Sequence, residues 1–232
     1  IALVLGGGAA RGFAHIGVIK ALEAQGIVPD IVVGTSAGSV VGALYASGMS
    51  GFELQNVALK MEEDMVADWT LPNRGVLKGE ALQDFINRNV KSLTIQKMPR
   101  PLGVVATDLQ SGDLMLFRRG DTGMAVRASS AVPGMFQPVE ISGRDYVDGG
   151  LTSPVPAQSA RAMGADFVIA VDISNVTRRD KLAGTLDVLL QTFAIMAKSI
   201  NTLELRDADV VLRPRLNGVG SADFLARQRA IV

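Results

Sequence analysis

Short runs of apolar residues alternate along the chain with longer segments whose hydrophobic positions recur every three or four residues. The runs have the length of buried strands, and the periodic segments have the length of helices. The apolar runs predict strands at residues 1–5, 30–33, 101–109, 113–119, 146–150, 166–173 and 210–212. The periodic segments predict helices at residues 13–25, 39–47, 52–69, 79–90, 122–131, 154–163 and 186–205. This alternation predicts one three-layer α/β/α domain over residues 1–232, with a mainly parallel central sheet.

Three of the predicted helices differ in how their apolar residues are distributed. The helix at 39–47 is almost entirely small and apolar, as a helix buried under a sheet would be. The helix at 52–69 is amphipathic, and an ordinary surface helix is the favoured interpretation. The alternative is a mobile lid over an acyl-chain groove, which its methionines and Trp69 would suit. The long helix at 186–205 is interrupted by charged and amide side chains, so we do not expect it to span a membrane.

The turn between residues 101–109 and 113–119 is Gln110-Ser111-Gly112, and it predicts a β-hairpin. Residues 175–184 are expected to form a polar loop, and the chain after residue 175 carries no motif that indicates a function.

Composition narrows the classes of function. With 48% hydrophobic residues the 232-residue chain can bury a large core. Its net charge is zero, which gives no electrostatic reason to expect a nucleic-acid partner. The absence of cysteine excludes disulfides and thiol catalysis, and a single histidine excludes a multi-histidine metal site. We therefore expect no metal and no cofactor. We expect a cytoplasmic or peripherally membrane-associated protein, while a signal or anchor upstream of residue 1 stays an open alternative.

The most informative stretch is Gly34-Thr35-Ser36-Ala37-Gly38, which follows a β-branched run and precedes the apolar helix. A sharp strand-to-helix turn of this kind lifts a serine hydroxyl clear of the backbone and is typical of a nucleophile elbow. The turn also opens a helix, so unpaired backbone N–H groups lie beside Ser36. A tight turn that merely contains a serine is the alternative.

A second glycine-rich turn, Gly6-Gly7-Gly8-Ala9-Ala10-Arg11-Gly12, follows the first predicted strand. A dinucleotide fingerprint would need glycine where Arg11 stands, and a phosphate-binding P-loop would need a Gly-Lys-Ser/Thr sequence that is absent. The better interpretation is a set of backbone N–H groups directed at one developing negative charge, which is an oxyanion hole.

The base that would activate Ser36 is less obvious from the residues. No histidine follows Ser36, and His15, on the first predicted helix, is more often a structural residue in such a place. Carboxylates at the ends of strands remain, namely Asp108, Asp148 and Asp172. Asp148 is the most site-like because Gly149-Gly150 lets the chain turn close to a neighbour, although Asp-Gly is also common turn chemistry.

Taken together, these motifs resemble the patatin-like phospholipase family. The resemblance rests on the triple-glycine turn, the Ala14-His15-Ile16-Gly17 stretch, the serine turn, the block from Arg127 to Phe136 and Asp148-Gly149-Gly150. It covers residues 1 to about 172 and implies the patatin-like fold. It also implies a serine esterase of lipid metabolism.

The resemblance implies a role for each matched residue. Ser36 would attack an ester carbonyl, Asp148 would be the base, and an acyl-enzyme would form and be hydrolysed. The oxyanion would be held by backbone N–H groups around Gly7, Gly8 and Ala9 with Arg11 nearby, and Ala37 N–H would be a further donor.

The resemblance also implies the partners. The expected substrate is a phospholipid or lysophospholipid, met during transient contact with a membrane surface through the helix at 52–69. Two alternatives belong to other classes: a catalytically quiet scaffold on the same fold, and a nucleotide-binding module built on the first glycine turn. The sequence does not indicate an oligomeric state.

Overall fold

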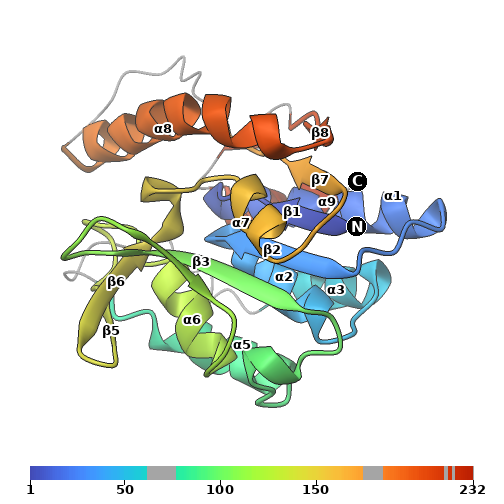
Figure 1. Cartoon of the computed structure of the whole chain (residues 1–232), viewed down its shortest axis with the longest axis horizontal. Coiled ribbons are helices and arrows are strands. Elements are labelled where there is room, and N and C mark those ends of the chain that lie inside the picture. The colour runs from blue at the N-terminus through green and yellow to red at the C-terminus, as the bar shows by residue number, and fades with distance from the viewer. Residues whose placement is uncertain (62–76, 175–184, 217–218, 221–222, 232) are drawn as a thin grey trace.

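The fold is built on one twisted sheet flanked by helices (Figure 1). The computed structural model describes residues 1–61, 77–174, 185–216, 219–220 and 223–231. Within these residues the strands are β1 (Ala2–Leu5), β2 (Ile31–Thr35), β3 (Leu102–Asp108), β4 (Leu114–Phe117), β5 (Val139–Ile141), β6 (Arg144–Asp148), β7 (Val168–Val171) and β8 (Val210–Leu212). Their order is β5-β6-β3-β2-β1-β7-β8, with β4 paired to β3.

Helices cover both faces of this sheet. They are α1 (Ala14–Ala24), α2 (Ala37–Ala46), α3 (Gly51–Leu59), α5 (Glu80–Asn89), α6 (Thr122–Ser129), α7 (Ala157–Ala162), α8 (Thr185–Glu204) and α9 (Arg227–Ile231). Two short 3₁₀-helices lie just beyond the ends of β1 and β6, η1 (Ala9–Phe13) and η3 (Gly149–Leu151). In the described part of the chain, no helix combines the length and the apolar character needed to cross a membrane.

The side chains of the central strands alternate between two cores. Leu3 and Leu5 of β1 belong to the larger core, which the side chains of α1, α2, α5 and α6 complete. Ala2 and Val4 point the other way, into a smaller core that includes Ala157 and Ala160 of α7. Since successive strand residues face opposite sides of a sheet, this division makes three layers. The predicted three-layer α/β fold with a mainly parallel sheet is confirmed.

Several element predictions are confirmed and a few are wrong. The hairpin formed by β3 and β4 is antiparallel as expected, and α8 matches the helix predicted at 186–205. The prediction at 154–163 starts too early, because Pro154 and Pro156 delay α7 to Ala157. The apolar runs do not predict strand β5, since three residues give too short a pattern.

The structure describes only the first part of the amphipathic segment predicted at 52–69. Helix α3 begins with a capping box between Ser50 and Glu53, and it ends at Leu59. Residues 62–76 lie outside the described residues, and so does the lid alternative.

Strands β2 and β6 meet end to end along one edge of β3. Val104 and Val105 pair with both β2 and β4, so β2 and β4 lie on opposite edges of β3. Ala106 and Thr107 pair with both β4 and β6, so β6 shares the edge that β2 occupies. Strand β2 runs parallel to β3 and ends opposite Val105, whereas β6 runs antiparallel and ends at Asp148, opposite Ala106. The carboxyl ends of two strands far apart in sequence therefore face each other.

Candidate active site

Ser36 stands where β2 gives way to α2, in a backbone conformation that a side chain rarely adopts. Its φ of 51° and ψ of −122° lie outside the helical and extended regions, and a residue held there costs about 1–3 kcal/mol. Because the chain turns sharply at this residue, the Ser36 side chain is half-buried while all ten residues of α2 are buried. The expected strand–turn–helix setting of a nucleophile elbow is present.

The two glycines of the serine motif are required because neighbouring backbone atoms lie too close to leave room for a side chain. A Cβ on Gly34 would collide with the carbonyl of Gly38, and a Cβ on Gly38 would overlap the carbonyl of Leu5 in β1. Any side chain at these positions would push the first turn of α2 away from the sheet. The glycines therefore let the helix start directly against the strand ends, where its unpaired N–H groups lie beside Ser36.

Asp148 is the carboxylate that faces Ser36. It ends β6 and is 8% exposed, and it lies close enough to the Ser36 hydroxyl for that group to lower the pKa of the carboxyl. Its Oδ1 accepts the Gly150 N–H at 2.7 Å, and its own N–H donates to Ala131 O at 3.0 Å. The meeting of β2 and β6 on β3 thus brings together Ser36 and Asp148, which the sequence motifs had indicated separately.

Burial sets the protonation of Asp148. Desolvation raises the pKa of this carboxyl to about 6, and the hydrogen bonds from the Ser36 side chain and the Gly150 N–H partly oppose that rise. The group is consequently ionised at neutral pH but far more basic than an exposed aspartate. A carboxylate of this basicity can accept a proton from a hydroxyl that it already contacts.

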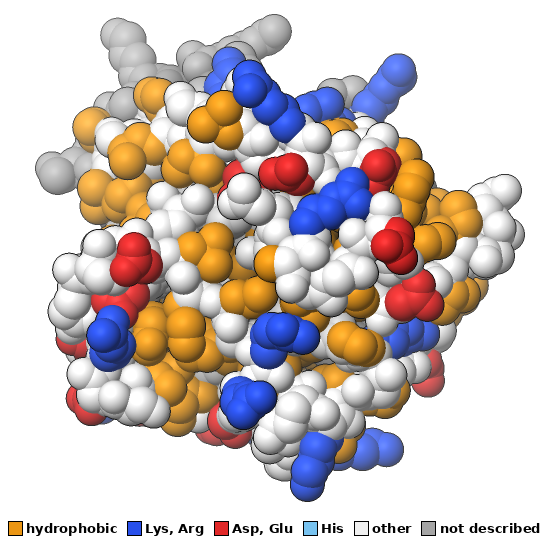
Figure 2. Space-filling model, in the orientation of Figure 1, with side chains coloured by type: hydrophobic (Ala, Val, Ile, Leu, Met, Phe, Trp, Pro, Cys, Tyr) orange, Lys and Arg blue, Asp and Glu red, His pale blue; other side chains and the backbone are white. Residues whose placement is uncertain are grey.

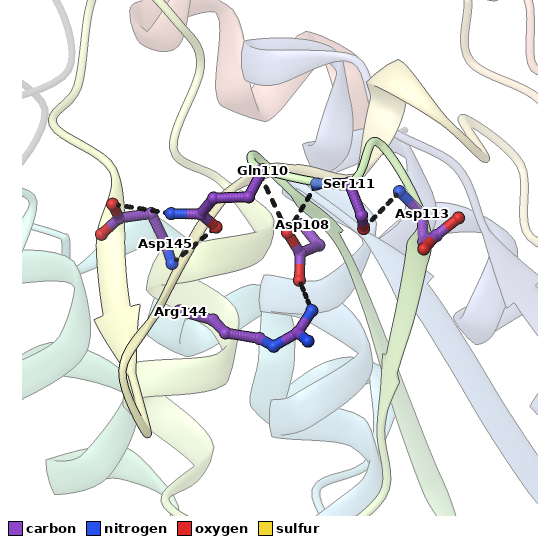
Figure 3. Close-up of polar contacts among 6 residues, drawn as sticks. All are labelled: Asp108, Gln110, Ser111, Asp113, Arg144 and Asp145. Atoms are coloured by element: carbon purple, nitrogen blue, oxygen red, sulfur yellow. Dashed lines mark hydrogen bonds and ion pairs between the residues drawn. The ribbon is translucent and has the colours of Figure 1, made fainter.

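The other two carboxylates considered from the sequence are engaged elsewhere. Asp108 lies at the β3–β4 turn, where it accepts the Gln110 and Ser111 N–H groups and a 2.6 Å bond from Arg144 Nη1 (Figure 3). The Arg144 side chain holds the pKa of Asp108 below its usual range. Asp172 accepts bonds from Ser174 and from Arg213 Nε. Within the described part of the chain, neither carboxylate bonds to Ser36.

His15 has a structural contact rather than one with Ser36. It is fully buried, and one ring nitrogen, Nε2, lies 2.8 Å from Gly6 O. Burial lowers the pKa of His15 to about 4, so the ring is neutral and its Nε2–H donates to that carbonyl. Among the described residues its Nδ1 has no hydrogen-bond partner. This neutral ring anchors the start of the first glycine turn.

The first glycine turn runs alongside the serine. Gly7 lies so close that a Cβ there would be 3.4 Å from Ser36 Cβ. Its N–H, however, donates to Pro154 O at 2.9 Å, and the Arg11 N–H donates to Gly8 O at 3.2 Å. Gly8 and Ala9 N–H have no acceptor among the described residues, and Ala9 adopts a positive φ of 50°. The Arg11 guanidinium donates to Val219 O and Ile173 O, so it ties this turn to the C-terminal part of the chain.

Ser36 thus stands on a strand-to-helix turn of a three-layer α/β fold and faces the dehydrated carboxylate of Asp148. The chain belongs to the patatin-like phospholipase family, whose sequence model matches residues 3–161.

Relatives in bacteria and animals support the same assignment. An uncharacterised NTE family protein of Mycobacterium tuberculosis is 37% identical over 177 residues, covering 75% of this chain and 49% of the relative. Patatin-like phospholipase domain-containing protein 6 of Homo sapiens is 38% identical over 188 residues, covering 78% of this chain and 14% of the relative. The chain thus spans about half the length of the mycobacterial relative and a smaller part of the human one.

A solved structure supports the fold alone. The crystal structure of VipD from Legionella pneumophila has a TM-score of 0.51 with 18% sequence identity, and the match covers 76% of this chain and 50% of that one.

Proposed function

We propose that this chain hydrolyses carboxylic ester bonds of phospholipids or lysophospholipids through Ser36 and Asp148. The observation that carries the proposal is the pairing of β2 and β6 on β3, which brings the Ser36 hydroxyl to the buried carboxylate of Asp148. Asp148 accepts the Ser36 proton as Oγ attacks the ester carbonyl. The proton then passes to the leaving alkoxide, and an acyl group remains on Ser36. Water, deprotonated by Asp148, hydrolyses that acyl-enzyme and restores the serine.

The oxyanion of each tetrahedral intermediate needs backbone donors. We assign this role to the N–H groups of Gly8, Ala9 and Ala37, which bond to no other described residue and lie on the two turns that flank Ser36. Gly7 is a neighbour rather than a donor in this proposal because Pro154 O already accepts its N–H. Arg11 acts by holding the first glycine turn in place. Loss of one such donor typically reduces rate by about 10²–10³.

The direct test is covalent labelling of the proposed nucleophile. A fluorophosphonate should form one adduct, on Ser36, and mixed phospholipid micelles should release fatty acid. A protein that hydrolyses no ester and takes up no label would instead be a catalytically quiet scaffold. A thermal shift with dinucleotides and none with an ester analogue would favour the nucleotide-binding alternative.

The basicity of Asp148 predicts an acid limb in the pH–rate profile. The mechanism needs ionised Asp148, and the pKa of this group is about 6. We expect kcat/KM for a short-chain p-nitrophenyl ester to be level above about pH 7 and to fall about tenfold per pH unit well below about pH 6. A limb centred near about pH 4, where an exposed aspartate titrates, would contradict the proposed environment of the base.

For the contact with lipid, helix α8 is a candidate beside the segment at 52–69, whose residues from 62 onwards lie outside the described part of the chain. Helix α3 exposes Phe52 at 66%, but α8 presents a longer apolar face. Two pairs of residues lie seven positions apart, Val188 with Ile195 and Met196 with Leu203. The four therefore share one side of the helix, and all of them are exposed. Figure 2 shows hydrophobic side chains gathered over the upper left of this view, where α8 lies in Figure 1.

The hydroxyl groups on α8 also suit an apolar surrounding. Thr192, Ser199 and Thr202 are exposed, and each hydroxyl donates to the carbonyl four residues earlier, at 2.8, 3.5 and 3.1 Å. A hydroxyl bonded in this way presents no free donor to its surroundings. Helix α8 also packs on η3, which follows Asp148, and its Glu204 accepts a 2.7 Å bond from Ser153 Oγ. We propose that this face contacts the lipid surface while the substrate enters.

The Ile195→Glu and Leu203→Glu double variant should lose about tenfold or more in binding to phosphatidylcholine vesicles, because burying one such side chain is worth about 1.5–3 kcal/mol. Its rate on a soluble p-nitrophenyl ester should stay unchanged. Val28→Glu is the matched control, since Val28 is 54% exposed but precedes β2 and so lies at the opposite end of the strands. Equal vesicle binding by all three proteins would contradict this assignment.

A further inference from the structure

The backbone amide of Ser36 does not bond to the sheet, although β2 leads directly to it. In the parallel pairing of β2 with β3, the Val32 N–H donates to Pro101 O at 2.9 Å. Donors of a parallel strand recur at every second residue, so the same ladder continued would join the Ser36 N–H to Val105 O. At Ser36 the chain leaves the sheet for α2, and this last rung is not formed directly.

The hydroxyl of Ser129 takes the place of this missing direct hydrogen bond. The Ser36 N–H donates to Ser129 Oγ at 2.8 Å, and Ser129 Oγ in turn donates to Val105 O at 2.5 Å. Ser129 is the last residue of α6 and is fully buried. Its hydroxyl therefore links the Ser36 N–H donor to the Val105 C=O acceptor, which do not bond to each other directly because the chain turns at Ser36. Without it, the partly buried Ser36 N–H and the buried Val105 C=O would both lose this partner.

The same segment also holds the other half of the site. The carbonyl of Ala131, two residues after Ser129, accepts the Asp148 N–H at 3.0 Å. One short stretch at the end of α6 thus fixes the backbone of both residues that face each other across the site.

We propose that Ser129 is the positioning residue for the nucleophile, holding Ser36 in its strained conformation so that Oγ points at Asp148 and at the substrate carbonyl. The inference rests on the proposed function. The carbonyl of Ser36 is already fixed by the N–H groups of Ser39 and Val40 at 2.8 and 3.2 Å. The hydrogen bond from the Ser36 N–H to Ser129 Oγ fixes the N-terminal side of the same residue. A strained residue keeps its conformation only when its surroundings fix it on every side.

The test compares Ser129→Ala with Ser130→Ala. Ser130 is the adjacent serine, and its buried hydroxyl has no partner among the described residues, so removing it should leave kcat within about twofold. Ser129→Ala should lower kcat by roughly 10–100-fold, since displacing a reacting group by about 1 Å costs on that order. Its KM and the position of the acid limb should stay unchanged, and the rate of labelling by a fluorophosphonate should fall with kcat.

A second variant distinguishes a loss of positioning from a loss of the fold. Ser129→Cys nearly keeps the side-chain volume but bonds weakly, and the chain contains no other cysteine to complicate the measurement. It should share most of the loss in kcat while its circular dichroism matches the parent. Normal kcat and labelling in Ser129→Cys, or equal losses in Ser129→Ala and Ser130→Ala, would overturn the inference. If Ser36→Ala itself stays active, the proposed function fails instead, whatever the Ser129 variants show.

Discussion

Ser36→Ala is expected to lower kcat on a p-nitrophenyl ester by roughly 10⁴–10⁶-fold, as removal of a catalytic serine does in other hydrolases. The reason is chemical, because the acyl-enzyme cannot form without the Ser36 oxygen. The fold should persist, since the side chain is half-buried and the backbone bonds of residue 36 are made by its N–H and C=O groups. Circular dichroism and a thermal melt of the same preparation provide the control.

Two results would contradict the role given to Ser36. One is turnover within about tenfold of the parent enzyme. The other is fluorophosphonate labelling of Ser36→Ala at the parent rate, which would move the nucleophile to another hydroxyl.

Asp148→Asn should be nearly as damaging, with kcat reduced by about 10⁴-fold, the loss seen when a buried catalytic aspartate becomes an amide. Asparagine keeps an oxygen for the Gly150 N–H but can no longer take the Ser36 proton. Activity above about one-hundredth of the parent would show that another group serves as base.

The same substitution should stabilise the folded protein at neutral pH. The folded-state pKa of Asp148 lies at about 6, above its ordinary value of 3.8, so the folded state binds more protons than the unfolded state between these values. Stability therefore falls as pH rises through this window, and above about pH 6 the deficit is about 3 kcal/mol. An asparagine at this position has no charge to bury, so the variant should avoid that deficit.

The measurement is a pair of melting temperatures for parent and Asp148→Asn. We expect the variant to melt several degrees higher at about pH 8 and the difference to shrink towards about pH 4. A variant that melts lower than the parent at both pH values would show that the carboxylate stabilises the fold.

The fold is largely predictable because its central strands are buried on both faces. Continuous apolar runs such as β1 and β7 cannot be satisfied on a surface, and the glycine turns mark where they end. Strand β5 is not predictable in the same way, because it is only three residues long.

Part of the candidate site could likewise be predicted from the sequence, and part could not. The spacing around Ser36 indicates the nucleophile from sequence, and the family resemblance selects Asp148 as its partner. The residues alone, however, leave Asp108 and Asp172 as alternatives to Asp148, because their contacts depend on which strands pair. The sequence also gives no reason to exclude the Gly7 N–H as an oxyanion donor, since its acceptor, Pro154 O, is far away along the chain.

Ser129 shows a different limit of sequence reasoning. It lies inside the block from Arg127 to Phe136 that carries part of the family resemblance. Nothing in that block indicates that its hydroxyl bridges the Ser36 N–H and the Val105 carbonyl of β3, because the bridge depends on where α6 ends against the sheet.

The end-to-end arrangement of β2 and β6 has a consequence for how the site can evolve. The distance between Ser36 and Asp148 is set by two neighbouring residues of β3, Val105 and Ala106, and not by the length of chain that connects them. Insertions between α2 and β3, or between β4 and β6, can therefore enlarge the chain and reshape its entrance without separating the pair. A one-residue slip of β6 along β3 would instead turn Asp148 to the other face of the sheet. Loop lengths are free to vary in this architecture, whereas strand register is not.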